Sequence, residues 1–75
     1  MENRKLDHLR FVYKAAVERW IETIREEEDL ATPGHSPVAV DVWEQAGFRE
    51  EEARQKAKSA RQEYEDALRR ALYNF

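Results

Sequence analysis

The sequence predicts an all-α protein: an antiparallel helical hairpin, with a long helix, a Pro/Gly turn and a second helix, that pairs with another copy into a four-helix bundle. Apolar residues recur at the three- and four-residue spacing of a helix, one Pro/Gly cluster divides the chain, and no strand-like alternation is sustained. The 75 residues form one domain, and a chain this short buries only about 60% of the surface that its unfolded form exposes. We therefore expect a homodimer.

The first helix is expected over about residues 2–31, which contain no proline or glycine. Its apolar stripe consists of Leu6, Leu9, Tyr13, Ala16, Trp20 and Thr23. A turn is expected over 32–36, because a Thr-Pro-Gly cluster ends the helix there. Ser36 followed by Pro37 then supplies a good N-cap and a good first residue for the next helix.

The second helix is expected over about 37–74, with a break at Gly47 left open, because the acidic run that begins at Glu50 is typical of a helix N-terminus. Its stripe is mostly alanine and consists of Ala39, Trp43, Ala46, Ala53, Ala57, Ala60, Tyr64, Ala67 and Ala71. Glu50 is out of place on that stripe. Since one stripe is bulky and the other small, we expect close packing, with Trp20 and Trp43 in the core.

Several apolar residues of the first helix lie off its stripe, namely Phe11, Val12, Ala15 and Ile21. A two-helix hairpin leaves them in water, so we expect them to contact a second copy or another protein partner. The net charge is +2 over 1–20, −8 over 21–52 and +3 over 53–75. An antiparallel dimer would lay each end against its opposite, although solvated ends without a partner explain the same layout.

An acidic run, Glu26-Glu27-Glu28-Asp29, lies near the end of the first helix, where the macrodipole is negative. We interpret the run as solvated and offset by the basic end of a dimer partner. The alternative is a site for a basic protein or for a cation, and Mg²⁺ or Ca²⁺ would need oxygen ligands that converge. In the turn, His35 with Trp43 is a candidate ligand-binding or pH-sensing site, with an ordinary turn residue as the alternative.

Catalytic and metal-binding patterns do not occur in the sequence. The chain has no cysteine, and neither His8 nor His35 follows a glutamate by three residues, which excludes a thiolate zinc site and the di-iron pattern of helical bundles. No Ser-His-Asp set, Cys-His pair or glycine-rich phosphate loop supports another reaction. We predict that the protein is not an enzyme and holds no metal or cofactor.

The segment "LDHLR", from Leu6 to Arg10, resembles the first-helix pattern of small all-helical chorismate mutases over five residues. That resemblance implies Arg and Lys side chains that converge inside the bundle on a dianionic substrate. Arg10 is the one matching position, whereas the two stripes here consist of other residue types. A small all-helical enzyme or a cation-binding module is therefore kept as an alternative.

A second alternative is a helix-turn-helix nucleic-acid-binding protein, since "VDVWEQAGFREEEARQK" places Gly47 between two helical segments. The glutamates that begin the reading helix and a pI near 5.4 disfavour phosphate binding. The sequence has no apolar leader segment and no long apolar run, so we expect a soluble, cytoplasmic protein without membrane contact. The predicted function is self-association and protein contact, as an adaptor, regulator or assembly module.

Overall fold

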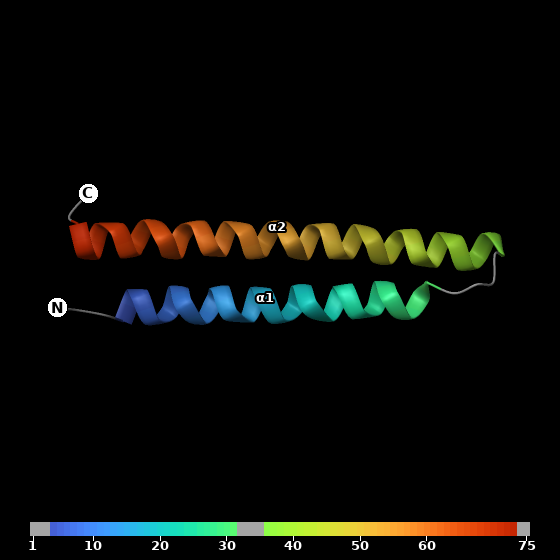
Figure 1. Ribbon diagram of the computed structural model, residues 1–75, viewed down its shortest axis with the longest axis horizontal. Helices are drawn as coiled ribbons and strands as arrows, with labels where there is room; N and C mark the ends of the chain where they lie inside the picture. Colours follow the sequence, from blue (N-terminus) through green and yellow to red (C-terminus); the bar gives the residue numbers. More distant parts are fainter. Residues whose placement is uncertain (1–3, 32–35, 74–75) are drawn as a thin grey trace.

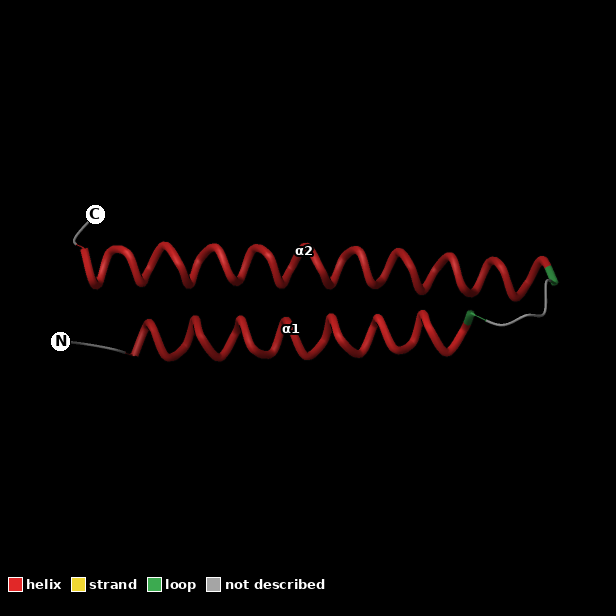
Figure 2. The backbone as a smooth tube through the Cα atoms, viewed as in Figure 1, coloured by secondary structure: helices red, strands yellow, loops and turns green. Residues whose placement is uncertain are grey.

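The computed structural model describes residues 4–31 and 36–73. Two helices, α1 (Arg4–Leu30) and α2 (Pro37–Tyr73), run antiparallel and lie side by side along the whole of α1 (Figures 1 and 2). The start of α1 and the end of α2 therefore lie at one end of the hairpin, the open end, and the end of α1 and the start of α2 lie at the other, the connection end (Figure 1). The prediction of an all-α hairpin of two packed helices is confirmed.

The second helix continues through Gly47 without a break. Glycine in a helix interior costs about 1 kcal/mol, but packing against α1 offsets it, because the preceding residue, Ala46, is only 1% exposed. The acidic residues behind Gly47 are accommodated in mid-helix by ion pairs one turn away, such as Glu52 with Lys56 at 3.3 Å. Since no turn separates two helices here, the arrangement that a helix-turn-helix requires is not formed.

Ser36 caps α2 as predicted. Its Oγ accepts a hydrogen bond of 3.1 Å from the backbone N–H of Ala39, and its carbonyl oxygen accepts one of 3.1 Å from the N–H of Val40. The first bond satisfies one of the backbone donors that a helix N-terminus leaves free. The rest of the predicted turn, including His35, lies outside the described residues.

The seam between the helices is made of small side chains of α2 facing larger ones of α1. The buried apolar residues are Ala46, Ala53, Ala57 and Ala60, which confirms that the alanine stripe faces inward. From α1, Thr23 is buried at 1% exposure, and its hydroxyl donates a hydrogen bond of 2.6 Å to the carbonyl of Trp20. Towards the open end, Tyr13 stacks on Tyr64 with ring centroids 6.3 Å apart.

The hairpin is a rod of 57 × 17 × 13 Å. Its radius of gyration is 17.2 Å, whereas a compact domain of this length has one of about 11 Å. Its accessible surface is 6151 Å², whereas a folded monomer of this mass exposes about 4,900 Å². One helical neighbour therefore covers only one side of each helix. Neither described helix combines the length and the apolar content needed to cross a membrane.

Candidate interaction surface

The hairpin has two long flanks of different character. On one, which we call the tryptophan flank, α1 contributes Val17, Ile21 and Ile24, and α2 contributes Trp43, Glu50 and Leu68. On the other, which we call the charged flank, α1 contributes Val12, Arg19 and Glu26, and α2 contributes Arg49, Glu52 and Lys56. Helical spacing places each set on one side of its helix, and the contacts between α1 and α2 show which sides coincide.

A polar contact joins the two helices at the edge of the tryptophan flank. The indole N–H of Trp20 donates a hydrogen bond of 2.6 Å to Oε2 of Glu50. This contact explains the glutamate that interrupts the alanine stripe, because a half-buried carboxylate is stabilised by a donor directed at it. Glu50 therefore belongs to the helix pairing and not to a solvated acidic run.

Arg54 lies next to this contact, one turn further along α2. Its Nε is 3.9 Å from Oε2 of Glu50, and its Nη2 forms an ion pair with Glu51. The Nε atom is buried and has no hydrogen-bond partner within the described residues. The tryptophan flank thus carries a cation whose hydrogen-bonding capacity is incompletely used inside the hairpin.

Beside the contact between Trp20 and Glu50, the tryptophan flank has an open groove near the connection end of the hairpin. The groove is lined by Ile24, Glu27, Glu28, Ala31, Trp43 and Glu50. Its apolar lining comes from both helices, and its rim is acidic. Trp43 itself is 42% exposed, so the prediction that it belongs to the core is wrong. Trp20, in contrast, is half-buried between the helices.

The charged flank is held by ion pairs. Arg49 of α2 pairs with Glu26 of α1 across the seam, and Arg19 lies in a small hollow with Lys56 and Ala53. The Arg49 and Glu26 side chains are about 40% exposed, so their ion pair contributes little to stability on its own, about 0–1 kcal/mol. The exposed large apolar side chains of this flank are valines: Val12 of α1 is 37% exposed, and Val38 and Val42 of α2, on the side of Lys56 and Arg49, are 72% and 41% exposed.

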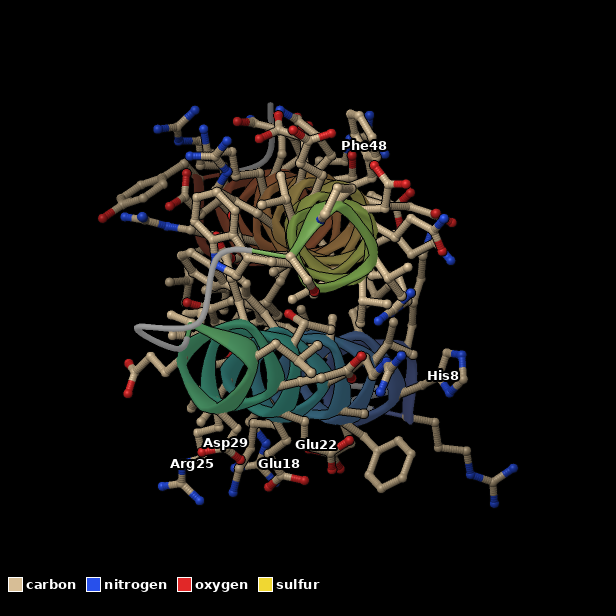
Figure 3. All side chains as sticks on the ribbon, turned by 90° about the vertical axis from the view of Figure 1, so that its right-hand side faces the viewer. His8, Glu18, Glu22, Arg25, Asp29 and Phe48 are labelled. Carbon is tan, nitrogen blue, oxygen red and sulfur yellow. The ribbon has the colours of Figure 1, made fainter. Side chains whose placement is uncertain are left out.

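The predicted interface residues do not share one face. Val12 and Ile21 are nine residues apart, or about half a turn beyond two full turns, so they lie on opposite flanks. Val12 lines a hollow with Ala60 on the charged flank. Phe11, which is 70% exposed, lies two turns before Glu18, a residue that points away from α2 (Figure 3). Ala15 is exposed one turn after Phe11.

The predicted acidic run also does not converge. Glu26 pairs with Arg49 across the seam, and Oε1 of Glu27 lies 3.7 Å from the place where a Cβ on Gly47 would stand. Asp29 points outward, away from both (Figure 3). Glu28 remains on the rim of the groove. Among the described residues, no three His, Cys, Asp or Glu side chains gather where they could hold a metal ion.

The two histidines give no common site. His35, predicted to act with Trp43, lies outside the described residues. His8 is exposed and points out from the side of α1 (Figure 3). Only Trp43 of the predicted turn pair can therefore be placed, and it lines the groove on the tryptophan flank.

A third surface is the outer face of α1. Glu18, Glu22, Arg25 and Asp29 all point away from α2 (Figure 3). Their spacing of three and four residues makes a continuous charged row along the helix. This face is typical of a helix side that stays in solvent.

No family model, no curated protein and no solved structure matches the chain.

Proposed function

We propose that the protein is a helical association module, an adaptor, regulator or assembly element whose hairpin pairs with a second copy into a four-helix bundle. The observation that supports it best is the tryptophan flank. Large apolar side chains follow both helices there and are only partly covered, with Ile21 41% and Trp43 42% exposed. Contiguous apolar surface of this kind marks contact sites for other proteins.

The energetics favour association. The buried core of the described hairpin consists of four alanines and one threonine, and alanine contributes little apolar area. Complete burial of a fully exposed Leu or Ile side chain stabilises by about 1.5–3 kcal/mol, and each partly covered side chain of this flank would gain a part of that on association. A second hairpin would thus supply most of the large apolar burial that the first lacks.

Charge layout supports an antiparallel arrangement of the two copies. The connection end of the hairpin, within 21–52, carries a net charge of −8, and both segments at the open end are positive. Hairpins that lie with their connections at opposite ends bring unlike charge together along the whole length. Hairpins with their connections together would concentrate like charge at each end.

Size-exclusion chromatography with light scattering tests the proposal on the full chain at micromolar concentration. We expect a mass of twice the 9.0 kDa chain. Dilution should lower helicity and mass together, because the fold and the association depend on each other. A fully helical species of 9.0 kDa would overturn the four-helix bundle.

A further inference from the structure

The tryptophan flank carries a heptad repeat whose residues match those of a second copy of the same helix running in the opposite direction. On α2 the residues that follow this flank recur with alternating steps of four and three: Trp43, Gly47, Glu50, Arg54, Ala57, Arg61, Tyr64 and Leu68. Such a heptad pattern is the seam along which helices pair with a partner helix. Ala57 and Tyr64 lie at the inner edge of the seam, against α1, and Arg61 at its exposed edge.

Antiparallel pairing of α2 with its own copy opposes compatible residues along the part of the seam that α1 leaves uncovered. In such a pair, residues at equal distances on either side of the two-fold axis lie opposite each other. With the axis between Gln55 and Lys56, the opposed residues are Trp43 with Leu68, Gly47 with Tyr64, and Glu50 with Arg61, while Arg54 stands at the level of Ala57, which α1 already covers. Large apolar residues meet, and a carboxylate meets a guanidinium.

The first helix shows the same property about its own midpoint. Its residues on the tryptophan flank recur as Arg10, Lys14, Val17, Ile21, Ile24 and Glu28. With the axis level with Arg19, Val17 lies opposite Ile21, Arg10 opposite Glu28, and Lys14 opposite Ile24, whose side chain the aliphatic part of the lysine can cover. No like charges are opposed on either helix.

The two midpoints lie at one level of the hairpin. Arg19 lines the same small hollow as Ala53 and Lys56, so the midpoint of α1 stands beside the midpoint of α2. The contacts between Glu26 and Arg49 and between Glu27 and Gly47 give the same alignment. A single two-fold axis therefore serves both helices. Nothing in the pattern of either helix alone requires this coincidence.

We infer that the tryptophan flank is covered by a second copy of this chain, turned end for end about a two-fold axis at the level of Arg19 and Lys56. This inference rests on the proposed self-association and specifies its face, direction and register. The axis falls near the middle of α2 (Pro37–Tyr73), so the long helices overlap fully. A shift of the two α2 helices by one heptad in either direction leaves one or two turns at each end uncovered. It brings Glu50 opposite Leu68 in one direction and Trp43 opposite Arg61 in the other.

Cysteine cross-linking tests the register, because the natural chain has no cysteine. Arg10→Cys and Glu28→Cys are made in separate chains, mixed to allow exchange, and oxidised with a glutathione buffer. The mixture should form a covalent dimer at least about tenfold faster than either variant alone. Position 10 of one copy faces position 28 of the other, whereas equivalent positions of the two copies lie about 27 Å apart, well beyond the reach of a disulfide.

A matched pair on the other side provides the control. Val12→Cys and Glu26→Cys stand at equal distances from Arg19 but on the charged flank, so their mixture should cross-link no faster than either variant alone. Light scattering and helicity are measured for all four variants before oxidation, and each should remain a helical dimer.

The outcomes separate the register from the proposed function. The chain could be dimeric although the mixture of Arg10→Cys and Glu28→Cys forms the covalent dimer no faster than either variant alone, or although one variant alone cross-links rapidly. Either result would overturn the register and leave self-association standing. Faster cross-linking of the control pair would assign the interface to the charged flank and overturn the inference. Helical monomers of the natural chain would overturn the proposed function together with this inference.

Discussion

Trp20 and Glu50, thirty residues apart in the sequence, are joined by a hydrogen bond of 2.6 Å from the indole N–H to the carboxylate. The contact fixes α1 against α2 at one height, where alanines elsewhere on the seam would allow the helices to slide. A small-residue seam is close-packed but offers few features that specify register, and a directed polar contact supplies one.

A double-mutant cycle tests this contact. We expect Trp20→Phe and Glu50→Ala each to lower the free energy of unfolding, and the double variant to lose less than the sum by about 1–2 kcal/mol, since the second change removes a group already unpaired. Urea unfolding at one fixed protein concentration measures all four proteins. Strict additivity would show that the bond does not contribute to stability.

The alanine seam predicts a strong size limit at its centre. Ala53→Phe should destabilise the fold by about 1–3 kcal/mol or more, because residue 53 is 6% exposed and a ring there must separate the helices. Ala15→Phe, the same change at an exposed position of α1, should stay within about 0.5 kcal/mol of the natural protein. Thermal unfolding followed by circular dichroism compares them. Equal effects at the two sites would contradict the close packing.

The cap of α2 predicts a difference between two serines. Ser36→Ala removes the acceptor for the N–H of Ala39 and should cost about 1 kcal/mol. Ser59→Ala, in the exposed middle of α2, should cost nothing or stabilise slightly, because alanine is the better helix former. If both serines behave alike in urea unfolding, the hydrogen bond to Ser36 does not stabilise the helix start.

Two exposed aromatic residues of α2 should differ in their effect on association. Trp43→Ala should raise the dissociation constant of the dimer at least about tenfold, because Trp43 lines the groove that the second copy would fill. Phe48→Ala should change it less than about threefold, although Phe48 is 72% exposed, because it points away from α1 (Figure 3). Analytical ultracentrifugation measures both constants. A larger effect at Phe48 would place the interface on the outer side of α2.

Charge reversal offers a matched comparison of the two flanks. Arg61 and Lys56 each pair with a glutamate one turn away, at 2.9 Å and 3.3 Å. Arg61→Glu would also face Glu50 of the second copy, so it should weaken the dimer by about 1–2 kcal/mol more than Lys56→Glu. Raising the salt concentration should reduce this difference, since exposed charges are screened. Equal weakening would remove the inferred contact between Arg61 and Glu50.

The hairpin could be predicted from the sequence because its signals are local. The spacing of the alanines identified the buried side of α2, and Ser36 with Pro37 identified its first turn. Gly47 gave an ambiguous signal, because its low helix propensity and the acids behind it suggest a break, while the burial of Ala46 that opposes a break depends on the other helix.

The details of the surface could not be predicted, because they depend on where α1 ends and how it aligns with α2. Trp43 shares the groove with Ala31, just beyond the last residue of α1, so too little of that helix lies beside the ring to bury it. Glu50 interrupts the alanine stripe in the sequence, and only the packing of α1 against α2 brings its hydrogen-bond donor, Trp20, beside it. The grouping of Val12 with Ile21 ignored the 100° that separates consecutive residues of a helix, which places these two on opposite flanks.

The outer face of α1, with its row from Glu18 to Asp29, has a consequence for any larger assembly (Figure 3). In the inferred pairing both copies of α1 lie on the same side of the bundle, so this row would be displayed twice, the copies running in opposite directions. A partner with two matching sites would then be held bivalently, with the second contact made at high effective concentration. A single hairpin offers that face once, so dissociation of the dimer would also abolish such avidity.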